Sequence, residues 1–292
     1  MTAARSPVRR AVRALAGAAG ATLAAVVLLL IGPLAVIAQG DVTPRGAWGW
    51  ASRESSGQAP DPSVERGAVV QVYGARTVGW RGAFAIHTWI ATKRSDEDAY
   101  TVHHVIGWRV FRGGRAVVSQ RGTPDAHWFG AYPELLADRR GEHVDALIDR
   151  LEAAVAAYPW PDTYRAWPGP NSNTFTAFVA RRVPELALDL PPTAIGKDWL
   201  EAGPFARTPS GSGWQLSLLG LLGVAVGLRE GMELNLLGLN VGIDVDDLVL
   251  RLPGLGRVGP WRAAEAAAAT PASGSAAVPP APAAPAPRPA SP

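Results

Sequence analysis

The sequence predicts an α+β fold in which an antiparallel sheet packs against two helices, behind an N-terminal transmembrane helix and ahead of a C-terminal β-rich unit. Three patterns lead to this prediction. An uncharged run covers residues 14–40, residues 68–119 alternate apolar and polar side chains, and residues 142–182 carry apolar side chains at helical spacing. Short connections between successive strands favour an antiparallel meander.

The first 40 residues predict a membrane anchor. Residues 1–13 carry four arginines and no acid, and residues 14–40 would form a helix of about 40 Å, longer than the roughly 30 Å hydrocarbon core. The positive-inside rule then places the N-terminus in the cytoplasm and the body on the extracytoplasmic side of the inner (cytoplasmic) membrane, which the chain crosses once. A cleaved signal peptide is the alternative, because Val36-Ile37-Ala38 is an acceptable small-residue cleavage site.

Composition excludes several classes of protein. The 292-residue chain has a formal net charge of +3, but four of its 28 basic residues lie in the leader, which leaves 24 basic against 25 acidic residues. A body without excess positive charge gives nucleic-acid binding no electrostatic support, so no nucleic-acid partner is expected. The absence of cysteine excludes disulfides, thiol catalysis and zinc–thiolate sites.

The body divides into a linker (41–66), an α+β core domain (67–212), a β-rich unit (213–262) and an Ala/Pro-rich tail (263–292) that is expected to be disordered. The β-rich assignment rests on the uncharged run from 213 to 228, which is too short to span a membrane. The core is predicted to contain strands at 68–73, 82–92, 100–111 and 116–119, and helices at 142–158 and from about 171 to 183.

A histidine on a strand and a serine at a helix start are the candidate catalytic residues. His87 lies in the second strand, and His104 on the third is expected to face the same side and to orient it. Ser172 follows Asn171 at the helix start, where backbone N–H groups favour an anion. Ser172 as nucleophile and His87 as base follow the logic of papain-type sites. The alternatives are an ordinary N-cap at Ser172 and a hydrogen-bonded core histidine at His87.

Ligand-binding candidates lie around these positions, namely Asn171, Asn173, Trp89 and Trp167. No histidine or carboxylate spacing fits a metal site. His103 and His104 are neighbours on one strand and therefore point to opposite faces. The sequence accordingly predicts neither a metal nor a cofactor.

The stretch from about Val69 to Gly259 resembles a bacterial family, domain of unknown function 3750. This resemblance implies membership of a family without an assigned activity. The segments that carry it are Val70-Gln-Val-Tyr73, Gly79-Trp-Arg-Gly82, His87-Thr-Trp-Ile90, Val105-Ile-Gly-Trp108, Trp167-Pro-Gly-Pro-Asn-Ser-Asn-Thr-Phe175 and Pro192-Thr-Ala-Ile-Gly-Lys-Asp198.

Two short motifs also resemble, more distantly, the circularly permuted NlpC/P60 proteins, which include the lecithin retinol acyltransferase-like proteins. In that group a histidine on an early strand precedes an Asn-Cys pair that begins a helix, and His87 and Asn171-Ser172 stand at comparable places. Ser172 replaces the cysteine. Because a serine hydroxyl is far less acidic than a thiol, the resemblance is also compatible with a scaffold that has lost catalysis and acts as a binding module.

Three functions follow from these patterns. The first is a membrane-anchored extracytoplasmic domain that contacts the membrane through residues 14–40 and binds an envelope-associated ligand. The second is a serine-dependent hydrolase or acyltransferase that uses Ser172 and His87. The third is a structural envelope protein whose β-rich unit lies against lipid. The sequence leaves open whether the protein is an enzyme.

Overall fold

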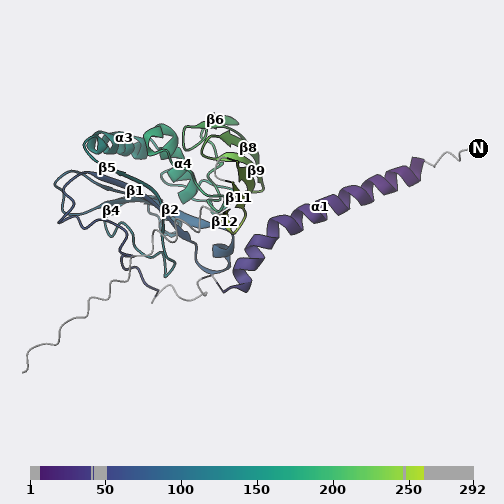
Figure 1. The fold of residues 1–292 in the computed structure, drawn as a ribbon, viewed down its shortest axis with the longest axis horizontal. Helices are drawn as coiled ribbons and strands as arrows, with labels where there is room; N and C mark the ends of the chain where they lie inside the picture. Colours follow the sequence, from purple (N-terminus) through teal and green to yellow (C-terminus); the bar gives the residue numbers. More distant parts are fainter. Residues whose placement is uncertain (1–6, 41, 43–50, 246–247, 260–292) are drawn as a thin grey trace, which may run out of the picture.

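The computed structural model describes residues 7–40, 42, 51–245 and 248–259, so the predicted tail at 263–292 lies outside the described residues. The α+β fold class is confirmed. The body contains two antiparallel sheets: helices between residues 144 and 182 cover the five-stranded sheet, and the seven-stranded sheet lies beside them at one end of the body. A long N-terminal helix projects from that end (Figure 1).

Helix α1 (Pro7–Ala38) contains the predicted apolar segment. Its stretch Val12–Ala38 has a mean hydropathy of 2.6 over its most apolar window and is long enough to cross a membrane; the same properties fit a signal sequence near an N-terminus. The helix ends against the body, where Pro33 and Val36 are buried, whereas its earlier turns stand clear of it (Figure 1). Its final turns are therefore part of the folded domain.

The five-stranded sheet has the order β4-β3-β2-β1-β5. Strands β1 to β4 form the predicted meander, and β5 returns to pair with the free edge of β1. The sequence analysis missed β5 because this edge strand is mostly exposed and lacks a clean apolar alternation. The strands are β1 (Val69–Arg76), β2 (Ile86–Lys93), β3 (Thr101–Val105), β4 (Val117–Arg121) and β5 (Glu134–Arg140).

Two predicted strands are shorter than expected. The third ends at Val105, and the chain turns into the short helix α2 (Gly107–Val110), because the ring of Tyr164 packs against the backbone of Gly107 so closely that a Cβ there would lie 2.4 Å from it. The second begins only at Ile86. The residues before it form a 3-10 helix, η2 (Gly79–Ala83), which α1 contacts.

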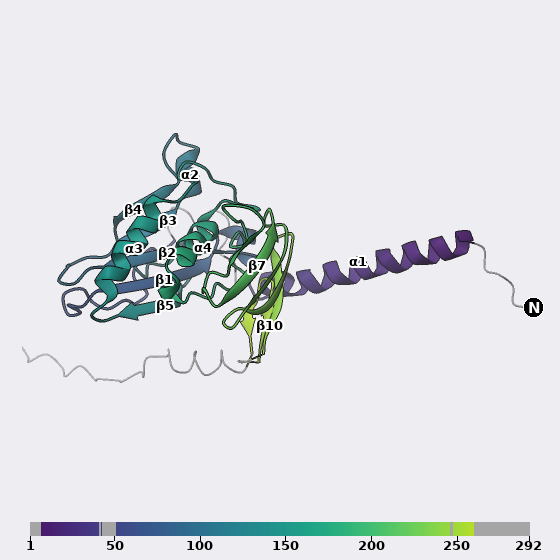
Figure 2. The ribbon, with the colours of Figure 1, turned by 90° about the horizontal axis from the view of Figure 1, so that it is seen from above.

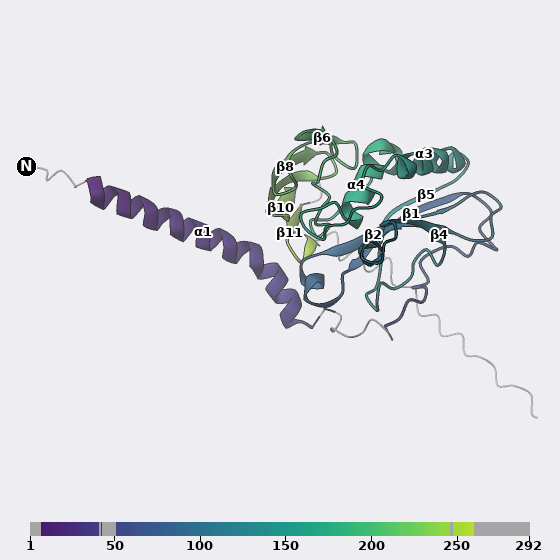
Figure 3. The ribbon, with the colours of Figure 1, turned by 180° about the vertical axis from the view of Figure 1, so that it is seen from behind.

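The helices α3 (Val144–Ala156) and α4 (Ser172–Arg182) cover one face of this sheet, as predicted (Figures 1 and 3). Their apolar residues, such as Leu151 and Phe175, pack with Val72 and Ile90 of the sheet into the main core. The opposite face carries a smaller core. Segments 51–66 and 122–133 lie over that second face.

The seven-stranded sheet forms the C-terminal unit, which confirms the prediction of a β-rich region there. All of its neighbouring strands are antiparallel and follow one another in sequence order. The strands are β6 (Phe205–Arg207), β7 (Gly213–Leu218), β8 (Leu222–Gly227), β9 (Gly231–Leu236), β10 (Leu239–Asp244), β11 (Val249–Leu252) and β12 (Gly256–Val258).

The inward face of the seven-stranded sheet carries polar and charged side chains. Glu233 accepts hydrogen bonds from Lys197 and from Arg251, whose Nε lies 2.6 Å from Oε1. Arg251, which is fully buried, also donates to both oxygens of Asp189 at 2.7 Å. Burial alone would raise the pKa of Glu233, but the two cations lower it, so the carboxylate stays charged. We refer to Asp189, Lys197, Glu233 and Arg251 as the buried ion cluster.

Removal of the Glu233 charge should destabilise the protein strongly. The Glu233→Gln variant leaves Lys197 and Arg251 buried with too little negative charge, so the free energy of unfolding should fall by about 3–5 kcal/mol. Chemical denaturation of the full chain in detergent measures this change. The control is Glu201→Gln, which breaks a half-exposed pair with Arg182 and should cost less than about 1 kcal/mol. Equal losses in the two variants would contradict a structural role of the cluster.

Candidate functional site

Strand alternation brings His87 and His104 together on the sheet face that α3 and α4 do not cover. His87 pairs with Ala75 in the β1–β2 ladder, and Ala75 and Trp89 both belong to the smaller core of that face. The ring centroids of His87 and His104 lie 5.7 Å apart. The predicted common orientation of the two histidines is therefore observed.

Tryptophans enclose these histidines. The ring of Trp128 stacks on His87 with centroids 3.8 Å apart and planes 10° apart, and Trp108 stacks on Trp128 at 5.9 Å. The ring centroid of Trp89 lies 5.9 Å from that of His87 on the same strand. We call His87, Trp89, His104, Trp108 and Trp128 the histidine–tryptophan cluster.

The loop that carries Trp128 is held in place by Asp125. This buried carboxylate accepts hydrogen bonds from the Ser55 and Ser56 hydroxyls and from the backbone N–H of Gln58 at 2.7 Å. Burial would raise the pKa of Asp125, but these hydrogen bonds lower it below its ordinary value. Asp125 thus fixes segment 51–66 and the Trp128 loop to each other. Sequence reasoning missed both Asp125 and Trp128, because residues 122–133 show no strand or helix periodicity.

The two histidines of the cluster carry ring nitrogens without partners. Among the described residues, neither His87 Nε2 nor His104 Nε2 has a hydrogen bond, although both atoms are buried. Burial, and then the neighbouring His104, lowers the pKa of His87 well below its ordinary value. Burial, with smaller contributions from His103 and Arg109, lowers the pKa of His104 to about 4. Both rings are therefore neutral at neutral pH and offer a hydrogen-bonding atom that the protein does not use.

Ser172 lies on the opposite side of the sheet from His87. It is the first residue of α4, and its backbone carbonyl accepts a hydrogen bond from the hydroxyl of Thr88. Thr88 and His87 are consecutive on β2 and point to opposite faces. The strand side chain nearest the helix start is thus a threonine, and the structure does not bring the predicted nucleophile and base together.

Asn171 and Asn173 hold the start of α4 in place. Asn171, rather than Ser172, is the N-cap, and its side chain accepts from the N–H groups of Asn173 and Thr174 in a capping box. The Asn173 side chain donates to the carbonyls of Ile86 and Ile195, at 3.0 and 2.8 Å. Their hydrogen-bonding groups are therefore occupied within the protein.

The remaining predicted residues are spread over the molecule. Trp89 is buried in the histidine–tryptophan cluster, where its indole N–H donates to Pro124. Trp167 is exposed, and its indole N–H donates to Leu237 in the β9–β10 turn, far along the chain. His103 faces away from His104, as predicted, and contacts Thr92 and Ser119. Within the described part of the chain, no three metal-ligating side chains gather.

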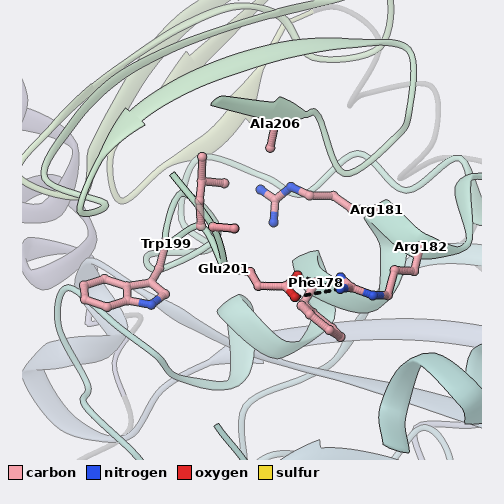
Figure 4. Close-up of a pocket in the computed structure, with 8 residues that line it drawn as sticks. Phe178, Arg181, Arg182, Trp199, Glu201 and Ala206 are labelled. Carbon is pink, nitrogen blue, oxygen red and sulfur yellow. Dashed lines mark hydrogen bonds and ion pairs between the residues drawn. The ribbon is translucent and has the colours of Figure 1, made fainter. Parts of the chain in front are cut away.

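A small cavity of about 120 Å³ lies beside the C-terminal end of α4 (Figure 4). Arg182 and Glu201 form an ion pair at its wall, and Arg182 also covers the ring of Phe178. The buried guanidinium of Arg181 donates to the carbonyls of Lys197 and Arg207 and to Gln215, and burial lowers its pKa to about 10. The arginines of the cavity are thus engaged by the protein itself, and no pattern in the sequence indicated this cavity.

Residues 67–199 match the model of the family described as "Protein of unknown function (DUF3750)". The match confirms the resemblance to that family over the core domain as far as Trp199, and it includes all of the histidine–tryptophan cluster. Comparison with curated proteins gives no match, and comparison with solved structures gives none either.

Acid should weaken the fold through the buried histidines. The unfolded chain protonates His104 near its ordinary pKa of 6.5, whereas the folded protein does so only near pH 4, so the unfolded state takes up more protons in between. The contribution of neutral His104 to the free energy of unfolding is therefore fully present above pH 6.5 and is lost as the pH falls toward 4. His104 alone should contribute a loss of about 2 kcal/mol between pH 7 and pH 5.

Chemical denaturation of the full chain at the two pH values measures this loss, and His104→Asn should reduce the pH dependence by that amount. The exposed His143, replaced in His143→Asn, controls for the removal of a histidine. An unchanged pH dependence in His104→Asn would show that His104 titrates alike in both states.

Proposed function

We propose that the protein is a membrane-anchored extracytoplasmic domain that binds an uncharged polar group of an envelope-associated ligand at the histidine–tryptophan cluster. The observation that carries this proposal is the pair of buried, unpartnered Nε2 atoms of His87 and His104 among the described residues. A buried polar atom without a partner costs about 1–3 kcal/mol. Two such atoms in adjoining rings are explained if a ligand supplies the missing hydrogen bonds.

The anchor is taken to be retained. Pro33 and Val36 are buried against the body, so cleavage after Ala38 would remove packing from the domain. The arginines at the start of the chain favour a cytoplasmic N-terminus, which leaves the body outside. This arrangement would present the cluster to molecules of the cell envelope.

The chemistry of the cluster favours a neutral ligand group. Both imidazoles are held neutral by burial, and each can either donate or accept one hydrogen bond according to its tautomer. Trp108 and Trp128, which are partly exposed, add flat apolar surface beside them. A hydroxyl or amide group next to an apolar chain or sugar ring fits this combination.

Calorimetric titration of the full chain in nanodiscs tests this proposal. The probes are N-acetylated disaccharides and short disaccharide peptides, which carry hydroxyl and amide groups. His104→Phe should weaken binding about tenfold, since it removes one hydrogen bond and keeps an aromatic ring. Trp80→Phe is the control, because Trp80 is an exposed aromatic residue outside the cluster. Absence of binding by every probe, or equal affinity in His104→Phe, would contradict the proposal.

A further inference from the structure

The outward face of the seven-stranded sheet is apolar. The strand register aligns two rows of exposed side chains across it. On this face, the described outward-pointing residues of β7 to β11 include no charged side chain. One row contains Phe205, Leu216, Val224 and Leu234, and the other contains Trp214, Val226, Met232, Ile243 and Leu250. We call these nine side chains the apolar sheet face.

This sheet is inverted relative to the usual arrangement in a water-soluble domain. Its inward positions hold the buried ion cluster and the amides of Gln215, Asn235 and Asn240, which donate to or surround Asp198. Its exposed positions hold leucine, valine, methionine and tryptophan. Water-soluble proteins rarely expose a contiguous apolar surface of this extent, so the face points to an apolar environment outside the chain.

Helix α1 is joined to the edge of this same sheet. Gly32 packs against the β11–β12 turn so closely that a Cβ there would lie 2.0 Å from the carbonyl oxygen of Pro253. In the turn, a Cβ on Gly254 would lie 2.6 Å from the backbone nitrogen of Pro33, and the Gly254 carbonyl accepts a hydrogen bond from Arg76 of β1. These backbone contacts fix the direction in which α1 leaves the body.

That direction is toward the side of the apolar sheet face. In Figures 1, 2 and 3, α1 runs away from the body on the side of the seven-stranded sheet that points away from α4. The sheet is seen nearly edge-on in Figure 2, with α1 extending outward from beside it. A membrane crossed by α1 therefore faces the apolar side of the sheet.

The length of the free part of α1 places the membrane surface at the sheet. Every residue from Val12 to Ile31 is exposed or partly exposed, and this stretch of about 20 residues extends roughly 30 Å, the thickness of the hydrocarbon core. Close packing against the body begins at Gly32. The hydrocarbon boundary thus falls where the helix reaches the β11–β12 turn.

We infer that the apolar sheet face lies flat on the lipid leaflet from which the body emerges. The leaflet accounts for the lack of charged side chains at the described outward positions of β7 to β11, for the direction of α1 and for the length of its free part. At one edge, Arg207 lies over the ring of Trp214, 4.0 Å from its centroid, and Phe205 stacks on the same ring. Tryptophan and arginine in this arrangement suit the headgroup region. The inference does not depend on a ligand at the histidine–tryptophan cluster.

Site-directed spin labelling of the full chain tests this inference. The chain has no cysteine, so each substitution creates a single labelling site. Val224→Cys and Leu234→Cys place labels near the middle of the face, and Leu23→Cys in the free part of α1 gives the lipid reference. Phe111→Cys, an exposed apolar residue far from the sheet, is the water control. Each phosphatidylcholine nanodisc holds one copy of the protein.

Collision rates with oxygen and with a water-soluble nickel chelate decide the outcome. Labels at 224 and 234 should collide with oxygen several-fold more than with nickel, as at 23, and the label at 111 should show the reverse ratio. Nickel access at 224 and 234 equal to that at 111 would overturn the inference. Protection from both reagents would overturn it too, because it would mean that protein covers the face. If a label at 224 or 234 disturbs the near-ultraviolet circular dichroism, Ile243→Cys on the same face replaces it.

Discussion

Two buried ion pairs, Lys197–Glu233 and Asp189–Arg251, join the halves of this molecule. Lys197 and Asp189 belong to the α+β core domain, whereas Glu233 and Arg251 point inward from the C-terminal sheet. Pairing of these charges therefore requires the sheet to turn its polar side toward the core domain. A buried charge without a partner is so costly that the sheet cannot turn over. The same constraint leaves the leucines and valines on the outside. The apolar sheet face is thus a consequence of how the interior is neutralised.

A second constraint is strand alternation in the core domain. It places His87 and His104 on one face of the five-stranded sheet and Thr88 on the other, against the start of α4. At the helix start, the Asn171 side chain accepts from the N–H groups of Asn173 and Thr174, whereas the ring of His87 lies under Trp128. The unpartnered Nε2 atoms of His87 and His104 are consequently on the face away from the helices.

The two features suggest one arrangement of the protein at a membrane. Helix α1 meets the C-terminal sheet at Gly32, and that sheet faces lipid in our inference. One end of the five-stranded sheet meets the same junction, because Arg76 of β1 donates to Gly254 and η2, which precedes β2, contacts α1. His87 pairs with Ala75, the residue before Arg76, so the histidine–tryptophan cluster lies near this junction.

The sequence by itself determined the apolar helix, the meander of β1 to β4, both core helices and the common side of His87 and His104, because these depend on local periodicity. The return of β5, the Trp128 loop and Asp125 were decided only by tertiary structure, since each is stabilised by partners distant in sequence. The separation of His87 from Ser172 was also decided there. Alternation fixes opposite sides of a strand, but only packing shows which side a helix covers. In the same way, the alternating pattern of the C-terminal strands predicts two faces, and the buried ion cluster decides that the apolar one is outside.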